Sequence, residues 1–472
     1  MKFTRIALAA AACCGLVATG AQAQGLRQPG SVQPAALTYD YYAQDNVAPS
    51  PSDLAAADTS GLAFAGDVSQ KDGKGCGCDA KGGGKDGKGG KGCNSCDPWR
   101  IFPTFGDGWT VQGWISGGGT VNADNPVSNY NGPITFNDRA DELMLNQFYL
   151  SMGRDADNGG CGWAWGGRMD LLYGQDYIFT QAAGLETNPD GTNNWNGSKM
   201  FGLAMPQVYG EVAYNDLSVK IGHFYTIMGY EVVPATGNFF YSHAYTMQYG
   251  EPFTHTGGLA TYDYSDRWTL YGGIVDGWDK FDAVTDKMAF LGGATYTPDH
   301  ERYTLTGTVI AGEEDGVAPP TTSRTGYSLV FNYDINSKLK YVLQHDNFWQ
   351  EDVFGPGVDA EWYGVNQYLF YTLNDCWSFG ARAEWFRDDD GVRLTNAPVR
   401  ETATGGAALL APAAAAGNYY NVTLGANWTP RSNLTVRPEA RWDWSDGTVG
   451  QPFDSGTKDS QFTAALDAIV VF

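Results

Sequence analysis

Sixteen short segments of alternating apolar and polar residues follow one another from Trp109 to the end of the chain, and no stretch among them has the period of a long helix. Seven of their connections are short and rich in Asn, Asp, Ser, Pro or Gly, whereas the eight that alternate with these run from about a dozen to about thirty residues. Short turns at one rim and long loops at the other are typical of bacterial outer-membrane barrels. We therefore expect an all-β fold, a transmembrane antiparallel β-barrel of about 16 strands over residues 99–472. The expected strands are 109–119, 143–153, 163–173, 206–214, 217–224, 257–264, 267–275, 288–297, 302–311, 324–334, 338–346, 362–372, 377–386, 419–428, 433–443 and 461–472.

The two faces of these segments support a membrane location. In the segment 433–443, Leu434, Val436 and Trp442 share one face, while Arg437 and Arg441 share the other. Aromatic residues recur near both ends of the segments, where a side chain that is apolar at one end and polar at the other suits the level of the lipid headgroups. We therefore expect the apolar face to contact outer-membrane lipid. The aromatic pairs are Trp163 and Trp165, Trp377 and Trp385, and Tyr420 and Trp428.

The two ends of the chain fit export to an outer membrane. Residues 1–23 begin with basic residues, continue with an apolar run and end on Ala21-Gln22-Ala23, which predicts a cleaved signal peptide; lipid attachment at Cys13 is the weaker alternative. The last segment alternates up to a terminal aromatic, Phe472. That ending resembles the strand by which the barrel-assembly machinery recognises its substrates, so we expect this machinery as a partner.

Residues 24–98 have no apolar period, which predicts a disordered linker on the periplasmic side. Its Gly- and Lys-rich part carries Cys76, Cys78, Cys93 and Cys96, which could bind a soft metal or form disulfides in an oxidising compartment. We favour the disulfides, because glycine-rich sequence does little to preorganise a metal site. The lysines of this tract could contact anionic cell-wall polymers, although we favour a solvated spacer as their role. Cys161 and Cys376 fall on different short turns, so we expect them not to pair with each other.

The inward face of the barrel should carry the chemistry. A formal net charge of −23 argues against nucleic acid as a partner. Sixteen strands enclose an aqueous channel rather than a packed core, and charges that line it bias which solutes enter. Several acidic and basic residues pair along one strand, so the charges could also neutralise one another. The expected pore-lining residues are Arg168, Asp170, Lys220, Lys340, Arg382, Glu384, Arg437, Glu439 and Arg441.

The third long loop, after residue 224, is less polar than a free extracellular loop should be. Apolar residues on that scale need cover, and the barrel interior supplies it. We therefore predict that this loop folds inward and narrows the channel, with Glu231 and Glu251 facing a basic wall; an oligomer contact of the loop at the outer surface is the alternative. Independently of the loop, a wide barrel could assemble as a homo-trimer through its outer wall. The constriction residues would be Glu231, Phe239, Phe240, Tyr241, His243, Tyr245 and Glu251.

Several runs resemble a known family. They are GWISGGG (113–119), the run from MPQVYGEV to PFTHTG (205–257), LYGGIVDGWD (270–279) and NQYLFYTLNDCWSFGARAEWF (366–386). Together with CDPW before the barrel, they are similar to the OmpL-like β-barrel porin family of planctomycete-type bacteria, over residues 98–472. The resemblance implies an outer-membrane location and a porin-like role, and no particular solute.

Together these features predict an outer-membrane porin, a passive diffusion channel for small hydrophilic solutes or ions that needs no cofactor. A surface-anchored structural or adhesive barrel with a plugged lumen is the alternative. An enzyme is less favoured: His243, Glu251 and His255 lie close in sequence and could be imagined as metal ligands or as a base with its orienting partner, but no motif fixes their geometry.

Overall fold

The computed structural model describes residues 101–472 except 107, 127, 189–191, 198–199, 283–286, 316–320, 354, 396–414, 448–449 and 455. The expected signal peptide (1–23) and linker (24–98), including Cys76, Cys78, Cys93 and Cys96, lie outside the described residues. The domain boundary near residue 98 therefore stays a prediction.

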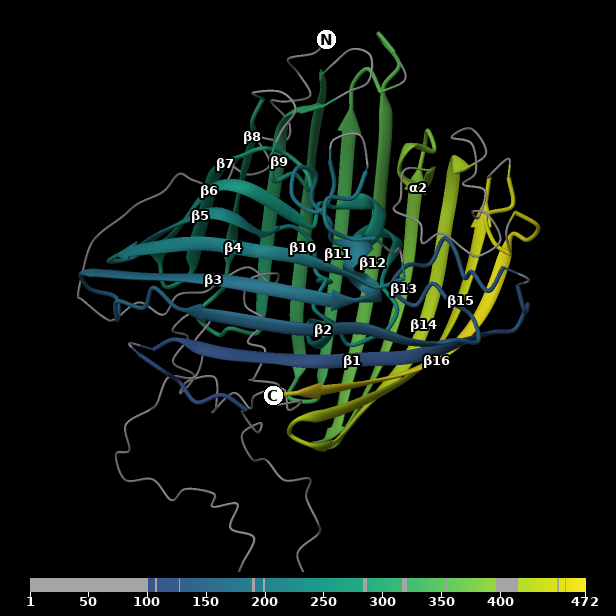
Figure 1. The fold of residues 1–472 in the computed structure, drawn as a ribbon, viewed down its shortest axis with the longest axis horizontal. Helices are drawn as coiled ribbons and strands as arrows, with labels where there is room; N and C mark the ends of the chain where they lie inside the picture. The colour runs from purple at the N-terminus through teal and green to yellow at the C-terminus, as the bar shows by residue number, and fades with distance from the viewer. Residues whose placement is uncertain are drawn as a thin grey trace, which may run out of the picture.

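The described residues form one closed antiparallel barrel in which each strand pairs with its neighbours in the sequence (Figure 1). The predicted fold class and the number of strands are confirmed. The strands are β1 (Thr110–Asn122), β2 (Leu143–Arg154), β3 (Trp163–Gly174), β4 (Gly202–Tyr214), β5 (Leu217–Tyr225), β6 (Thr254–Ser265), β7 (Trp268–Val275), β8 (Ala289–Tyr296), β9 (Tyr303–Asp315), β10 (Thr321–Asn336), β11 (Leu339–Gln350), β12 (Ala360–Asn374), β13 (Trp377–Asp388), β14 (Gly417–Arg431), β15 (Leu434–Asp446) and β16 (Ser460–Val471).

Pairing between the first and last strands closes the barrel. β1 and β16 run antiparallel in a register that places Trp114 opposite Val471. Beyond that pair, the Gly113 N–H donates to the Phe472 carbonyl and the Phe472 N–H donates to the Gly113 carbonyl, each at 2.9 Å. A closed barrel leaves no sheet edge with unpaired backbone groups, which is a requirement for strands in lipid.

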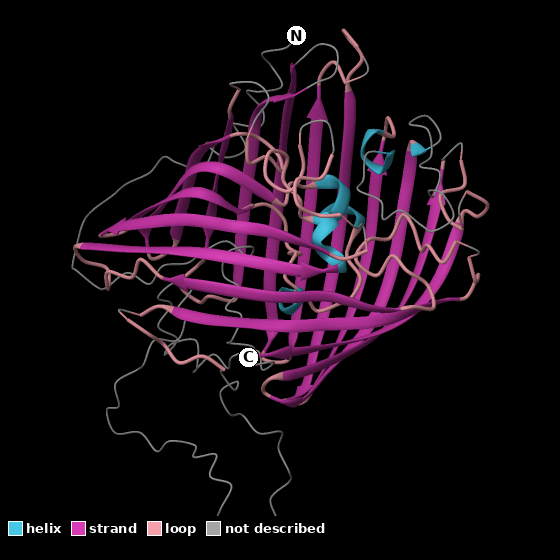
Figure 2. Cartoon of the chain, in the orientation of Figure 1, coloured by secondary structure: helices cyan, strands magenta, loops and turns pink. Residues whose placement is uncertain are grey.

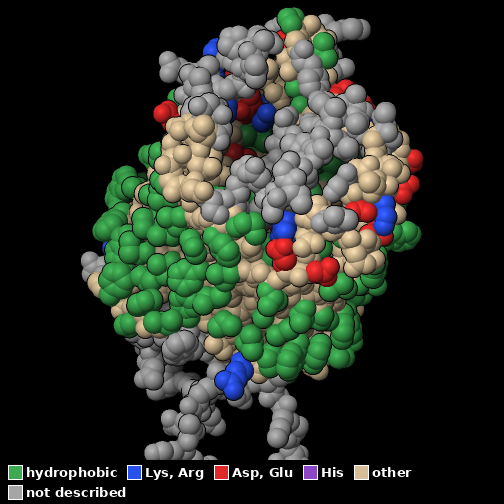
Figure 3. Space-filling view, turned by 45° about the vertical axis from the view of Figure 1, so that its right-hand side comes forward, with side chains coloured by type: hydrophobic (Ala, Val, Ile, Leu, Met, Phe, Trp, Pro, Cys, Tyr) green, Lys and Arg blue, Asp and Glu red, His purple; other side chains and the backbone are tan. Residues whose placement is uncertain are grey.

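The outer wall is a hydrophobic band with charged side chains beyond it (Figure 3). Trp442 and Leu466, from adjacent strands, are each 53% exposed on the outside of the barrel. Aromatic pairs mark both ends of the strands: Trp377 and Trp428 stack with ring centroids 5.9 Å apart near the short turns, and the rings of Tyr420 and Trp444 stack at 5.2 Å near the long loops. This arrangement fits two aromatic girdles around a lipid-facing belt. Among the described residues, no helix is long and apolar enough to cross a membrane.

Several strands continue beyond the predicted ends, on the side of the long loops. β9 reaches Asp315 and β10 begins at Thr321, and the ladder still pairs Glu314 with Thr322. The connections 316–320 and 351–359 are therefore shorter than the expected dozen residues. The extensions of β9 and β10 are polar on both faces, so alternation fades there although backbone pairing continues.

Residues 226–253, which join β5 to β6 and are called the inserted loop below, lie inside the barrel, as predicted. The loop contains two short helical turns, η2 (Ala235–Gly237) and η3 (Thr246–Gly250), and Figure 2 shows helical turns enclosed by the strands. Nearly all of the loop is buried. Two further short helices, η1 (Gln175–Phe179) and α2 (Val392–Thr395), belong to other long loops.

Candidate functional site: the inserted loop

Carboxylates on the barrel wall hold the backbone of the inserted loop. Glu439 on β15 accepts the N–H groups of residues 241–242 at 2.9 and 3.1 Å. Glu384 on β13 accepts those of residues 245–246 at 2.8 and 2.7 Å. The two side chains are 7% and 5% exposed. Charge-assisted bonds to backbone N–H groups are stronger than neutral ones, so these two glutamates fix the path of the loop along β13 and β15.

Three arginines on the same strands hold the carbonyl groups of the loop. Arg437 Nη1 donates to the carbonyls of residues 235 and 238 at 2.9 and 2.7 Å, and Arg441 Nη1 donates to that of residue 243 at 2.6 Å. Arg382 Nη1 donates to the carbonyl of Ser242 at 2.8 Å. The wall thus supplies donors and acceptors to an irregular segment that could not satisfy its own backbone inside the barrel.

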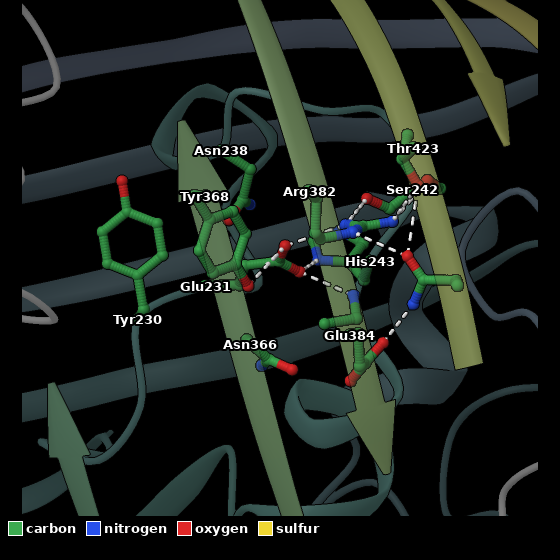
Figure 4. A network of polar contacts seen from close by, with 12 residues as sticks. Tyr230, Glu231, Asn238, Ser242, His243, Asn366, Tyr368, Arg382, Glu384 and Thr423 are labelled. Atoms are coloured by element: carbon green, nitrogen blue, oxygen red, sulfur yellow. Dashed lines mark hydrogen bonds and ion pairs between the residues drawn. The ribbon is translucent and has the colours of Figure 1, made fainter. Parts of the chain in front are cut away.

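Glu231 is the charged centre of the loop (Figure 4). Its Oε1 lies 2.8 Å from Arg382 Nη1 and accepts the Tyr368 hydroxyl at 3.1 Å, while Oε2 accepts the Ala244 N–H at 2.8 Å and lies 3.4 Å from His243 Nδ1. Burial alone would raise the pKa of Glu231, but Arg382 and His243 lower it to about 2. Burial lowers the pKa of His243. At neutral pH the centre is therefore a carboxylate and guanidinium pair beside a neutral imidazole.

The contacts of Glu251, at the end of the inserted loop, differ from those that were predicted. It was expected to face a basic wall, but its Oε1 accepts a hydrogen bond from the Gln344 amide, which also donates to Asp346 Oδ2 at 3.0 Å. The prediction was wrong because the loop turns towards β11 before it joins β6, away from the arginines of β13 and β15. Burial, and then the charge of Asp346, raise the pKa of Glu251.

This raised pKa makes a testable contribution to stability. A carboxyl group whose folded pKa is raised stabilises the folded state below its ordinary pKa of 4.5, and loses that contribution as the pH rises through the folded value. We expect the urea midpoint of the wild-type barrel to fall as the pH is raised from 4.5 into the neutral range, and the Glu251→Gln variant to lose roughly half or more of that fall. Glu313→Gln, which changes an exposed carboxylate paired with Lys287, is the control. Equal pH slopes for Glu251→Gln and wild type would show that Glu251 does not titrate in this range.

Aromatic side chains of the loop pack against the wall where that wall carries glycine. A Cβ at Gly380 on β13 would lie 2.4 Å from the Phe239 ring, and one at Gly425 on β14 would lie 3.1 Å from the Phe240 ring. Phe240 also packs with Tyr368 and with aliphatic side chains of β10 and β11. These inward-facing glycines are visible in the sequence and mark where the loop approaches the wall. Alternation of apolar and polar residues alone does not reveal this signal.

Five of the nine predicted pore-lining residues are covered by the loop, namely Arg382, Glu384, Arg437, Glu439 and Arg441, each 7% exposed or less. These five residues point inward, and in this structure the loop covers them. On β3, Arg168 pairs with Asp170 at 2.8 Å, and Asp170 is fully buried. Lys220 on β5 and Lys340 on β11 face inward and are half-buried. The ammonium of Lys220 lies 4.5 Å from the ring centroid of Tyr209.

The remaining predicted loop residues also bind the wall. The Tyr241 hydroxyl donates to Asn146 Oδ1 at 2.7 Å, and the Tyr245 hydroxyl donates to Asp443 Oδ1 at 2.6 Å. The wall partners lie on β2 and β15, so the loop is bonded to strands from both ends of the barrel sequence. All seven predicted constriction residues therefore lie inside the barrel.

The histidines and carboxylate considered for catalysis have separate partners. His255 Nδ1 lies 2.8 Å from the Gly277 carbonyl and its Nε2 lies 2.9 Å from Thr226 Oγ1, whereas His243 adjoins Glu231 and Glu251 adjoins Gln344. Within the described ranges, no three His, Cys, Asp or Glu side chains are grouped so that they could hold a metal ion.

The two cysteines of the described strands and turns are not paired with each other, as predicted. Cys161 is exposed and has a free thiol, whereas Cys376 is disulfide-bonded.

Comparisons with known proteins agree with the barrel. An anion-selective porin from Comamonas acidovorans is similar in structure, with a TM-score of 0.54 and 10% identity over 77% of this chain and 99% of that one. OmpT, an outer-membrane protein of Vibrio cholerae described in a trimer form, has a TM-score of 0.50 and 12% identity over 77% and 99%. None of the curated proteins compared with the chain matches it. At such low identity the structural likeness shows the fold alone. The family described as "Putative beta-barrel porin-2, OmpL-like" matches residues 108–472, the same residues that form the barrel, and the chain therefore belongs to this family of outer-membrane porins.

Proposed function

We propose that the barrel is a passive diffusion channel for small hydrophilic solutes or ions, and that solutes pass between the inserted loop and the wall formed by β3–β11. The observation that carries the proposal is the placement of charge: the loop takes up Arg382, Arg437 and Arg441, whereas Lys220 and Lys340 face inward, half-buried, with no loop group bonded to them among the described residues. Charges at a narrow level of a pore bias the sign of the permeating ion.

Reversal potentials across a salt gradient test this path. We expect the double variant Lys220→Gln/Lys340→Gln to conduct in a planar lipid bilayer with its selectivity shifted towards cations relative to wild type. The control is Lys338→Gln, at the exposed turn between β10 and β11. An unchanged reversal potential would contradict the proposed path. Silence from a demonstrably folded barrel would contradict the channel itself.

A plugged barrel that serves as an anchor is the second candidate, and one observation favours it. The apolar cluster inside the barrel includes not only the inserted loop but also Trp278 and Val392 from two other long loops. A lumen filled at that level would pass no solute. The same bilayer measurement separates the two candidates, since an anchor would give no stepwise conductance.

The proposed partners follow from the ends and outer face of the chain. The terminal strand, which ends in Phe472 beside Gly113, would present the barrel to the assembly machinery, and residues 24–98 would lie in the periplasm with the cell wall within reach of their lysines. We further propose a homo-trimer. Mass measurement of the detergent-folded barrel tests the oligomeric state.

A further inference from the structure

We propose that the side of the barrel bearing the long loops carries a binding site for a small organic carboxylate, formed by Arg324 on β10 and Arg393 in α2 around the indole rings of Trp278 and Trp362. The site is separate from the inserted loop's charged centre and from the lysines of the proposed path. Figure 3 shows this end of the molecule hollowed between loops, with acidic and basic side chains inside the hollow. Carboxylate binding here does not depend on conduction.

Two guanidinium groups converge on one aromatic pair. The Cζ of Arg324 lies 4.5 Å from the ring centroid of Trp278 and 5.9 Å from that of Trp362. The Cζ of Arg393 lies 5.0 Å from each. The two indoles are edge to face at 6.1 Å, and Phe348 stacks on Trp362 at 5.8 Å. Like charges repel at this range, so bringing both arginines to one place has a cost that a bound anion would offset.

The donors of Arg393 are only partly used. Its Nε donates to the Tyr249 carbonyl at 2.5 Å, and its two terminal nitrogens make no hydrogen bond or ion pair within the described part of the chain. Arg393 is half-buried, and burial, followed by the charge of Arg324, lowers its pKa to about 10. Nearby, the buried Nε1 of Trp278 also has no hydrogen-bond partner among the described residues. Unused N–H donors on a guanidinium and a neighbouring indole favour a ligand with negatively charged acceptor oxygens.

Two of the neighbouring carboxylates are occupied by backbone groups. Asp388 accepts the N–H groups of residues 392–394 at 2.8 to 3.0 Å, which positions the turn that carries Arg393. Asp279 accepts those of residues 253–254, both at 2.8 Å, and burial raises its pKa to about 6. These groups hold the loops in place and leave the terminal nitrogens of Arg393 to a ligand.

A third carboxylate, Glu314, is shared among several groups. It pairs with Lys280 at 2.7 Å, accepts the backbone N–H of Trp278 at 3.1 Å and lies 3.8 Å from Arg324 Nη1. Because its charge is divided between Lys280 and Arg324, it does not neutralise both arginines.

The ligand class follows from these groups. A guanidinium binds a carboxylate through two parallel N–H donors, a match of planar shapes that a spherical anion cannot make. The surrounding rings of Trp278, Trp362 and Phe348 favour a ligand with an apolar body attached to its carboxylate. Benzoate is a probe with both features, acetate has only the carboxylate, and inorganic phosphate has only the negative charge.

Isothermal titration of the detergent-folded full-length barrel with benzoate tests the site. We expect saturable binding by wild type and a loss of affinity of about tenfold or more in Arg393→Gln, since hydrogen bonds to charged groups contribute about 1.5–3 kcal/mol. The matched control is Arg387→Gln, an arginine paired with Asp389 near the same end of β13, which should bind as wild type does.

Each outcome of the titrations either supports or overturns the proposed carboxylate site. Absence of saturable benzoate binding by wild type, equal affinity in wild type and Arg393→Gln, or an equal loss in Arg387→Gln overturns the site. Binding of phosphate without benzoate overturns the carboxylate assignment. Heat modifiability on gels establishes folding in every sample. The titration does not require the barrel to conduct, so the two proposals can fail separately. A barrel that binds benzoate but does not conduct would reject the proposed channel and support the site. A barrel that conducts but does not bind benzoate would reject the site and support the channel.

Discussion

Replacing Arg382 with methionine is expected to raise the single-channel conductance several-fold. The substitution leaves the Glu231 carboxylate buried at the centre of the inserted loop without its cation, 2.8 Å away in the wild type, and removes the donor to the Ser242 carbonyl. Breaking a buried ion pair by removing one partner costs about 3–5 kcal/mol. The loop avoids this cost by leaving the wall so that Glu231 reaches water, which widens the lumen. Single-channel recording in planar bilayers measures the change.

A second substitution tests whether the unpaired charge is the cause. Replacing both members of a buried pair with uncharged groups is often neutral, so Arg382→Met/Glu231→Gln should return the conductance towards the wild-type value. Arg267→Met, at the exposed pair with Asp299, should change nothing. If Arg382→Met alone leaves the conductance unchanged, the carboxylate bonds from Glu384 and Glu439 suffice to hold the loop.

Substituting valine for Gly364 is expected to unseat the second half of the inserted loop. A Cβ at this position on β12 would lie 2.3 Å from Thr246 Oγ1. That hydroxyl donates to Glu384 at 2.8 Å, beside the Thr246 N–H bond to the same carboxylate, so Thr246 has little freedom to move aside. Overpacking of this kind costs about 1–3 kcal/mol. Chymotrypsin, which cleaves after aromatic residues, should then cut within residues 226–253 of the barrel in lipid vesicles.

Mass spectrometry of the fragments locates the cuts. The control is Gly210→Val on β4, where an added Cβ meets nothing within 4 Å. Resistance of the Gly364→Val loop equal to that of the wild type would mean that η3 absorbs the added side chain without leaving the wall.

The strands were predictable because lipid and lumen impose a period of two on every segment that separates them. β15 shows this: Trp442 is exposed on the outside, while Arg437 and Arg441 are buried on the inside. Where a strand rises above the membrane, as β9 does near Glu314, both faces are polar and the pattern fades before the ladder ends. The predicted positions of the strand ends were therefore wrong mainly at the rim that bears the long loops.

The inward path of the third long loop was also predictable, because its aromatic residues required cover. The wall residues that the loop contacts were not predictable. Glu231 and Glu251 look equivalent in the sequence, yet one meets Arg382 and the other meets Gln344 and Asp346. That difference depends on how the loop crosses the lumen, which is set by contacts such as Phe239 against Gly380, far apart in the sequence. Alternation along a strand carries no information about what lies opposite it.

The bonds that hold the inserted loop join parts of the chain made at very different times. The Tyr245 hydroxyl and its acceptor on Asp443 are 198 residues apart, and Arg437 and the carbonyl of residue 235 are 202 apart. The loop is therefore synthesised before β15, which receives it, and contacts of such long range form slowly. We therefore expect the loop to take its place only after β13 and β15 have formed, so that narrowing of the lumen is a late event in folding. A barrel caught before that event would already have its strands in place and would still be wide open.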